Sequence, residues 1–321
     1  MPIDVQVKES CYMATHTPKL SIPRPRAFVL DFDGTITTKD TIDTLAQFGI
    51  SKQATRGLDL KGEWDEVVTK YGEDFSTHVE NYRPVKEDRR TLKEEVNYCR
   101  SLKEIEKRSF GRITSSGIFK GIDAGEWHDF GVHSVENGLV KLRNGIGKFV
   151  SEVMANNGNM CGIVSVNFSR YFIRGVLAQV SSALDGINII ANAANAAGIL
   201  EGFGVSDKSH PAQVIATSED KLAALKDMLG FWRSNGHLAE TNMDTVYIGD
   251  SGTDIECLME DRIIGIVILE DGQSSLMETF KRVGVEVFHI RDFREKSEKS
   301  VYWARDFEEI AQSPLINPIS R

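Results

Sequence analysis

The stretch "FVLDFDGTIT" at residues 28–37 places two aspartates, one residue apart, at the end of an apolar run. Acidic residues are poor strand formers, and burying an unpaired carboxylate is costly. Residues i and i+2 of a strand share a face, so Asp31 and Asp33 begin on the same side where the strand ends. Gly34 then allows a tight turn. The stretch predicts a buried strand that presents acidic groups at its carboxyl end.

From residue 145 onward, helical and strand-like patterns alternate. Apolar positions at helical spacing predict helices over residues 146–154, 169–180 and 218–229. Short apolar runs predict strands at residues 27–32, 161–166, 187–193, 244–250, 261–269 and, as the last one, 285–290. This rhythm favours an α/β fold with a doubly wound parallel sheet, whose functional residues lie beyond the carboxyl ends of the strands.

Residues 41–140 carry many charges and few strand-like runs, which predicts a mostly helical insertion. Helices are expected over residues 40–50, with Asp40 as a cap, and over residues 63–75. Within residues 91–108, apolar side chains recur at steps of four and three, as on one face of a single helix. These side chains are Leu92, Val96, Cys99, Leu102 and Ile105.

The chain therefore divides into three parts. They are a proline-rich N-terminal arm at 1–26, a core domain at 27–40 and 141–321, and the helical insertion at 41–140. Near the end of the core, residues 302–310 are expected to form a closing helix, with Trp303 and Phe307 packed on the domain.

The composition limits the classes of partner that are expected for this chain. A net charge of -9 over 321 residues argues against nucleic acid or an anionic membrane as the main partner. No segment reaches the roughly 18 apolar residues of a membrane span, and the N-terminus lacks a signal pattern. The four cysteines are widely spaced, which is typical of reduced thiols in a cytoplasmic protein. They are Cys11, Cys99, Cys161 and Cys257.

A second acidic cluster follows another predicted strand. In "YIGDSGTD", residues 247–254, Asp250 and Asp254 flank a small, turn-forming run. Since parallel strands end at the same edge of a sheet, these aspartates are expected to converge with Asp31 and Asp33. Clustered carboxylates repel one another, and a divalent cation relieves that repulsion. Oxygen ligands without His or Cys suit Mg²⁺, so the pattern predicts Mg²⁺ and phosphate chemistry.

Four segments of the chain resemble the motifs of one known superfamily. "DFDGTIT" at residues 31–37 resembles the D-x-D-x-T nucleophile loop of the haloacid dehalogenase superfamily of phosphatases. Three further segments are similar to the second, third and fourth motifs of that superfamily, namely "IVSVNFSRYFI" (163–173), "SEDKLAALKDML" (218–229) and "IGDSGTD" (248–254). "RNGIGKFVSEVMANNG" at 143–158 is similar to the phosphoserine-phosphatase-like branch, in which the insertion between the first two motifs forms a helical cap.

The resemblance implies a Mg²⁺-dependent phosphomonoesterase that acts on a small phosphorylated metabolite. Asp31 would attack phosphorus and form an aspartyl-phosphate, and Asp33 would protonate the leaving oxygen and then activate water. In such a reaction, most of the catalytic effect comes from neutralising charge on the transferring group.

The resemblance also implies ligands. Asp31, Asp250 and the main-chain oxygen of Asp33 would hold Mg²⁺, and Asp254 would be a further ligand or would orient the others. Ser165, with nearby amides, would hold a phosphate oxygen. A lysine of the third motif would neutralise charge, and Lys221 fits best. Lys208 and Lys226 remain alternatives for that lysine.

One departure from the family pattern concerns the residues after Ser165. Close phosphoserine phosphatases have Gly-Gly there, whereas this chain has Val166 and Asn167. The Val166 amide is still available, but the close approach that glycine allows is in question, so the substrate fit is expected to differ.

Rival functions remain open on the sequence. One is a non-catalytic or regulatory relative, although such proteins typically lose the nucleophile that this chain keeps. Another is a phosphotransferase that uses the same aspartyl-phosphate chemistry. Dehalogenation fits poorly, because dehalogenases of this superfamily generally lack the second aspartate. The substrate and the oligomeric state are left open.

Two weaker signals lie in the insertion. His128 and His133 are five residues apart, which more often reflects ordinary histidines than a metal site. Five arginines could form a cationic lid for an anionic substrate or simply a solvated face, and they are Arg83, Arg89, Arg90, Arg108 and Arg112.

Overall fold

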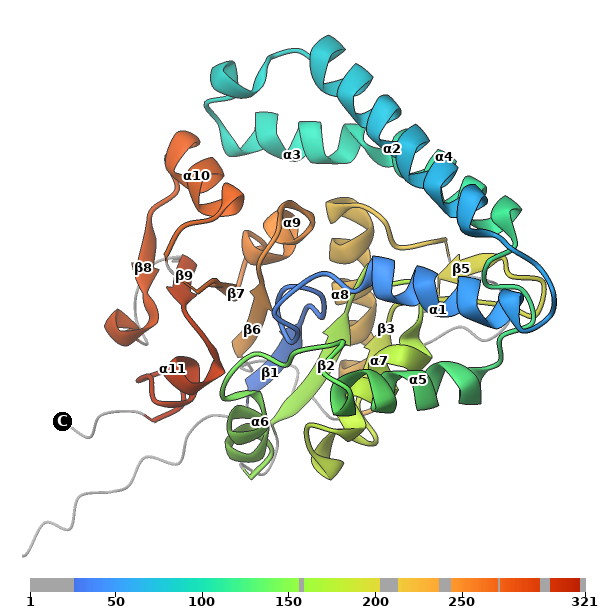
Figure 1. Ribbon diagram of the computed structural model, residues 1–321. Coiled ribbons are helices and arrows are strands. Elements are labelled where there is room, and N and C mark those ends of the chain that lie inside the picture. Colours follow the sequence, from blue (N-terminus) through green and yellow to red (C-terminus); the bar gives the residue numbers. More distant parts are fainter. Residues whose placement is uncertain are drawn as a thin grey trace, which may run out of the picture.

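The structure is a computed structural model, shown in Figure 1. It describes residues 26–155, 159–202, 213–236, 244–270, 272–294 and 301–317. The predicted N-terminal arm, apart from Arg26, lies outside these ranges. Among the described residues, no helix combines the length and the apolar character required to cross a lipid bilayer.

Seven strands of the described chain form one fully parallel sheet in the order β3-β2-β1-β6-β7-β9-β8. Their bounds are β1 Arg26–Leu30, β2 Met160–Val164, β3 Asn188–Ile190, β6 Asp244–Gly249, β7 Ile263–Ile268, β8 Val287–His289 and β9 Val301–Ala304. β1 lies between β2 and β6, so the two acidic segments follow neighbouring strands. The predicted doubly wound α/β fold is confirmed.

Alternate residues of β1 bury against opposite faces of the sheet. Phe28 and Leu30 belong to the apolar cluster that includes α6 (Ile146–Ala155), α7 (Arg170–Ala178) and α11 (Phe307–Ala311). Ala27 and Val29 pack with α8 (Ser218–Ser234), α9 (Ile255–Leu258) and α10 (Ser275–Arg282) on the other face. Because both faces are covered, β1 is apolar throughout, as expected of a central parallel strand.

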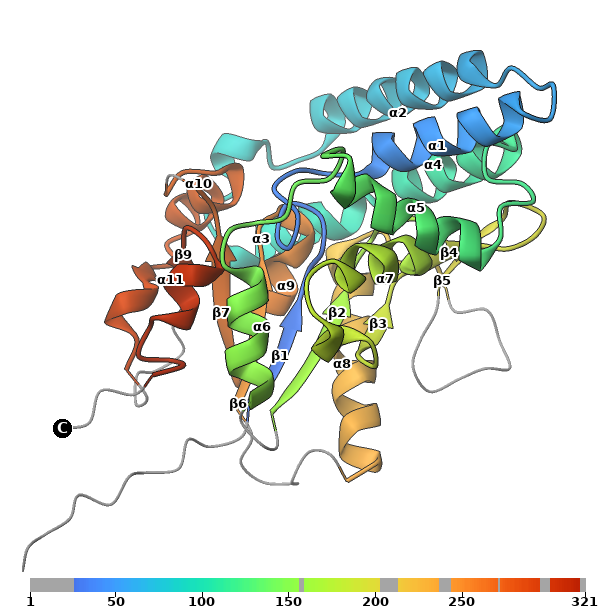
Figure 2. The same cartoon turned by 60° about the horizontal axis from the view of Figure 1, so that its bottom comes forward.

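The insertion contributes five α-helices to the described chain. They are α1 Ile42–Ala54, α2 Lys61–Asn81, α3 Leu92–Ser101, α4 Lys103–Ser116 and α5 Ala124–Glu136, with a 3-10 turn at Lys86–Asp88. Of these, α1–α4 lie over the carboxyl ends of the strands, and α5 lies beside α7 (Figure 2). Capping boxes start α3, at Thr91 with Glu94, and α5, at Asp123 with Glu126. At the start of α1, Asp40 accepts a hydrogen bond from the Ile42 amide at 2.7 Å, while Thr41 occupies the N-cap position.

The single helix predicted over residues 91–108 is wrong. The chain changes direction at Leu102, where α3 ends and α4 begins. The two helices face different surfaces: Val96 and Cys99 of α3 pack with the cluster around α8, whereas Phe110, further along α4, belongs to the cluster that includes α2. One straight helix would not reach both.

Two predictions near the sheet edges also need correction. The strand predicted over 187–193 is split, because β4 (Asn192–Ala194) leaves the sheet and pairs antiparallel with β5 (Leu200–Gly202). The helix predicted over 302–310 is wrong in its first half, where β9 inserts between β7 and β8. Pairing with two strands decides the structure there, and α11 begins only after its cap, Asp306.

Ion pairs tie the insertion to the core. Arg100 pairs with the buried Glu256 of α9, and Lys103 pairs with Asp220 at the start of α8, 3.1 Å away. Arg282 of α10 lies 2.9 Å from Glu95 of α3. These contacts hold α3 and α4 against the amino ends of α8 and α9 and against the carboxyl end of α10.

Two glycines let α5 approach α7 closely. A Cβ at Gly131 would overlap the main-chain oxygen of Phe172, and a Cβ at Gly175 would overlap that of His128. The helices therefore contact each other through their backbones. Gly111, on the exposed side of α4, has nothing within 4 Å of such a Cβ.

We expect Gly131→Ala to lower the free energy of unfolding by about 1–3 kcal/mol, because the methyl group forces the helices apart. Gly111→Ala is the matched control and should raise it by up to about 1 kcal/mol, since alanine is the better helix former. Urea unfolding followed by circular dichroism measures both. Equal effects of the two changes would contradict the close packing of α5 on α7.

Candidate active site

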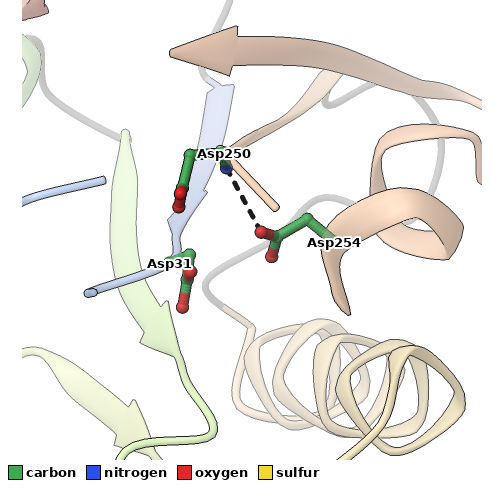
Figure 3. Close-up of side chains that lie close together, drawn as sticks. All are labelled: Asp31, Asp250 and Asp254. Atoms are coloured by element: carbon green, nitrogen blue, oxygen red, sulfur yellow. Dashed lines mark hydrogen bonds between the residues drawn. The ribbon is translucent and has the colours of Figure 1, made fainter. Parts of the chain in front are cut away.

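Three carboxylates meet at the carboxyl edge of the sheet. Asp31 follows β1, Asp250 follows β6, and Asp254 ends the 3-10 turn Gly252–Asp254. One side-chain oxygen from each lies within 4.8 Å of the others. Figure 3 shows the three side chains close together. Within the described ranges, this is the one group of three or more His, Cys, Asp or Glu residues so arranged, and neither His128 nor His133 belongs to such a group.

Lys221 joins this cluster from the first turn of α8, which Thr217 caps. Its Nζ donates a hydrogen bond to Asp254 Oδ1 at 2.7 Å and lies 2.9 Å from Asp31 Oδ1. The side chain is fully buried. Of the alternative lysines, Lys226 forms a surface ion pair with Glu260, and Lys208 lies outside the described residues.

Asp254 has hydrogen-bond donors on both of its carboxylate oxygens. Oδ1 accepts from Lys221 and from the Tyr247 hydroxyl at 2.6 Å. Oδ2 accepts from the amides of Asp250 and Ser251 and from the Ser251 hydroxyl, at 3.1–3.2 Å. These bonds fix the loop that carries Asp250 and aim Lys221 at Asp31. Of the two roles left open for Asp254, the orienting one suits this geometry.

The Asp33 carboxylate is held apart from this cluster, so the expected convergence of side chains holds for three of the four aspartates. Its Oδ1 accepts hydrogen bonds from the Thr41 amide at 3.0 Å and hydroxyl at 2.6 Å. Its Oδ2 accepts from Asn167 Nδ2 at 2.8 Å, and Asn167 is completely buried. Sequence reasoning treated Asn167 only as a departure from glycine and missed this contact. The polar amide in place of a glycine was the available signal.

Ser165 lies at the carboxyl end of β2, beside β1. It is fully buried, and its Oγ accepts a hydrogen bond from the Asn167 amide at 3.2 Å. Within the described residues, no hydrogen bond joins Ser165 to the aspartates. Its hydroxyl proton is therefore available to an anion at this edge of the sheet.

The turn after Asp33 is braced by a residue that sequence reasoning also missed. Arg143 Nε donates to the main-chain oxygen of Thr35 at 2.9 Å, and its Nη2 donates to that of Gly34. Thr35 Oγ1 donates to Asp250 Oδ1 at 2.8 Å. Gly34 has a φ of 72°, and a Cβ there would overlap the Asp250 carboxylate. Glycine is thus needed for both conformation and space.

The arginines considered for a cationic lid have other partners. Arg89 is buried against Glu95, 2.7 Å away, and Arg108 and Arg112 both pair with Asp74. The Arg83 side chain donates hydrogen bonds to two main-chain oxygens. The main-chain amide of Arg90 donates a hydrogen bond to the Glu94 carboxylate. The set does not form one positively charged surface over the aspartates.

Burial and mutual repulsion shift the carboxyl groups of the site. Burial, followed by the charge of Asp254, raises the pKa of Asp31 well above its usual value and that of Asp250 to about 7. Burial, followed by the charge of Asp40, raises the pKa of Asp33 to about 6. For Lys221, burial opposes the charged form, but Asp254 and Asp31 outweigh it, so its pKa is raised.

The acidic cluster fits a divalent cation. Asp31, Asp250 and Asp254 face one buried lysine, which leaves excess negative charge in a buried site. Asp31 Oδ1 is buried and accepts no aligned hydrogen bond. The atoms that could bind the cation are all carboxylate oxygens, which are ligands that Mg²⁺ prefers.

Comparison with known proteins decides the family. The model of the haloacid dehalogenase-like hydrolases matches residues 28–259, about seven-tenths of the chain. The chain belongs to this family. The predicted superfamily is thereby confirmed, and the expected haloacid dehalogenase-type phosphatase agrees with it.

The individual proteins that match this chain share about a quarter of the aligned residues with it. Cold tolerance protein 1 of Saccharomyces cerevisiae is 24% identical over 288 residues, which cover 83% of this chain and 86% of that protein. A CTO1 family protein of Schizosaccharomyces pombe is 25% identical over 240 residues, covering 72% and 77%.

Solved structures with detectable likeness include phosphoserine phosphatase in its apo form, with 14% identity, a TM-score of 0.45, and coverage of 90% of this chain and 98% of that one. Cytosolic 5'-nucleotidase IIIB bound to cytidine has 14% identity, a TM-score of 0.48, and coverage of 91% and 85%. These scores are too low to support a functional assignment.

The buried position of Lys221 generates a stability prediction. Lys221→Met should lower the free energy of unfolding by about 3–5 kcal/mol, because it leaves two buried carboxylates without their cation. Lys226→Met removes only a surface pair and should change it by less than about 1 kcal/mol. Urea titrations in EDTA compare the two. A similar, small loss in both variants would contradict the central place of Lys221.

Proposed function

We propose that this chain is a Mg²⁺-dependent phosphomonoesterase that hydrolyses a small phosphorylated metabolite in the cytoplasm. The observation that carries the proposal is Asp31 at the end of β1, buried and 2.9 Å from Lys221, with Asp250 on the neighbouring strand. A buried carboxylate beside a fixed cation suits a nucleophile that receives an anionic phosphoryl group.

In the first step, an Asp31 oxygen attacks phosphorus, the bond between phosphorus and the leaving oxygen breaks, and an aspartyl-phosphate forms. Asp33 gives its proton to the leaving oxygen. In the second step, Asp33 takes a proton from water, which attacks the aspartyl-phosphate and releases inorganic phosphate. The bonds from Thr41 and Asn167 keep the Asp33 carboxyl group in one orientation for both transfers.

Charge on the transferring group is countered from several sides. Lys221 neutralises one phosphoryl oxygen, and Ser165 with the Val166 amide binds another. Asp31, Asp250 and the main-chain oxygen of Asp33 would hold Mg²⁺, which supplies further neutralisation when bound. Asp254 orients Lys221 and the Asp250 loop through its bonds to both.

In this proposal, residues 27–40 and 141–321 form the catalytic core and residues 41–140 form its cap. The position of α1–α4 over the carboxyl ends of the strands supports that division. The cytoplasmic location is supported by Cys99, Cys161 and Cys257, which are free thiols. Cys11 lies outside the described residues.

The activity test is phosphate release from p-nitrophenyl phosphate and a panel of metabolite phosphates, with Mg²⁺ or with EDTA. We expect Mg²⁺-dependent release by the wild type, and a loss of at least about 10³-fold in Asp31→Asn, because the nucleophile is removed. If the folded wild type binds Mg²⁺ but releases phosphate from no panel member, the proposal fails in favour of a binding protein. Transfer of the phosphoryl group to an added alcohol instead of water would favour the phosphotransferase.

Asn167 is expected to act by positioning Asp33. Asn167→Ala should lower kcat by about 10–100-fold with little change in KM, since Asp33 loses one of its anchors. Asn137→Ala, on the exposed end of α5, is the control and should keep the wild-type kcat. Thermal unfolding of both variants shows whether a lower kcat comes from misfolding or from a misplaced Asp33 carboxyl group. An unchanged kcat in folded Asn167→Ala would show that Thr41 alone holds Asp33.

A further inference from the structure

A cavity of about 520 Å³ lies between the insertion and the core. Its lining comes from α2, α3 and α4 on one side and from the amino ends of α8, α9 and α10 on the other. Ser251, Gly252 and Thr253 line it, and they connect Asp250 to Asp254. Thr217 and Ser218, just before Lys221, line it as well. The cavity therefore adjoins the two segments that carry Asp250, Asp254 and Lys221.

The insertion side of the cavity is rich in aromatic rings. Tyr71 and Phe75 of α2 line it with their rings nearly parallel, at an interplanar angle of 25°, and Tyr98 of α3 lines it as well. All three are partly exposed. Aromatic faces bind flat rings by stacking and bind cations through the ring quadrupole. The volume falls in the range of small-molecule pockets.

One of the two acidic residues of the lining has no basic partner among the described residues. Glu106 of α4 accepts a hydrogen bond from the Tyr71 hydroxyl at 2.8 Å through Oε1. No Lys, Arg or His of the described residues forms an ion pair with Glu106, and its side chain is only partly buried. Burial raises the pKa of Glu106. A half-buried carboxylate of this kind gains from a cation brought by a ligand.

The other charged residues of the lining do not share this property. Glu95 lies between Arg89 and Arg282, at 2.7 and 2.9 Å. Arg89 also lies 4.0 Å from the centre of the Tyr98 ring. Lys86 is exposed to solvent. Glu106 is thus the residue of this cavity whose negative charge a cationic ligand would balance.

We infer that this cavity binds the leaving group of the substrate and selects a phosphomonoester whose leaving group carries a flat ring and a positively charged amino group. The inference rests on the proposed phosphatase function and adds a substrate class to it. The ring lies against Tyr71 and Phe75, and the amino group pairs with Glu106. Glu106 and Tyr71 are specificity residues and take no part in the bond-breaking steps.

The test compares three synthetic esters with alkyl leaving groups. They are 4-(aminomethyl)benzyl phosphate, 4-methylbenzyl phosphate, which lacks the charge, and 6-aminohexyl phosphate, which lacks the ring. We expect the wild type to favour the first over each of the others by about 10-fold or more in kcat/KM, as a hydrogen bond to a charged group would give.

Glu106→Gln keeps an acceptor for the Tyr71 hydroxyl and removes only the charge. It should lose the preference for 4-(aminomethyl)benzyl phosphate over 4-methylbenzyl phosphate and hydrolyse the latter within twofold of wild type. Glu104→Gln is the control on the same helix, because Glu104 is exposed and pairs with Lys107. It should keep the full preference.

The outcomes separate the two proposals. Asp31-dependent hydrolysis of all three esters at similar kcat/KM, or a preference that survives in Glu106→Gln, overturns the substrate class and leaves the phosphatase standing. If none of the esters is hydrolysed, calorimetry with 4-(aminomethyl)benzyl alcohol decides. Binding by the wild type that weakens tenfold in Glu106→Gln supports the specificity of the cavity, whereas no binding, or equal binding, overturns it.

Discussion

The buried ion pairs of Lys221 are the interaction on which the site depends. Lys221 Nζ lies 2.7 Å from Asp254 and 2.9 Å from Asp31, and all three side chains are almost inaccessible to solvent. Buried carboxylates this close would repel each other and take up protons if no cation lay between them. Lys221 thus makes it possible for β1 and β6, adjacent central strands, to end in acidic residues. It also links α8 to the sheet at the point where chemistry is proposed.

The rest of the structure supports this arrangement from two sides. Below the site, alternate residues of β1 bury against helices on both faces of the sheet, which fixes the register of the strand ends. Above it, the insertion encloses a cavity whose lining combines aromatic rings with Glu106. Arg143 and Asn167 come from segments before and after β2 and fasten the turn that carries Asp33. The reactive groups belong to the sheet, and the groups that would contact the rest of a substrate belong to the insertion.

The sequence was sufficient for six of the seven strands of the described sheet and for the approach of Asp31, Asp250 and Asp254, because these follow from local patterns. Apolar runs that end in aspartate predict strand ends, and parallel strands bring those ends together, so the approach of Asp31 to Asp250 could be foreseen. The bend at Leu102 could not, because one apolar stripe fits either a single helix or two helices that face different surfaces. β9 depends on pairing with β7 and β8, and Asn167 bonds to Asp33 across 134 residues of chain. Such long-range contacts leave little trace in local periodicity.

The close contact of α5 with α7 changes where the structural boundary of the insertion lies. Because the two backbones touch at Gly131 and Gly175, α5 packs as part of the core although it belongs to the insertion in sequence. The Phe48 ring stacks on Phe130, which joins α1 to α5. Residues 55–60 and 117–123 join these two helices to α2–α4. The insertion as the sequence defines it thus contains two helices that pack as part of the core and three that cover the edge of the sheet.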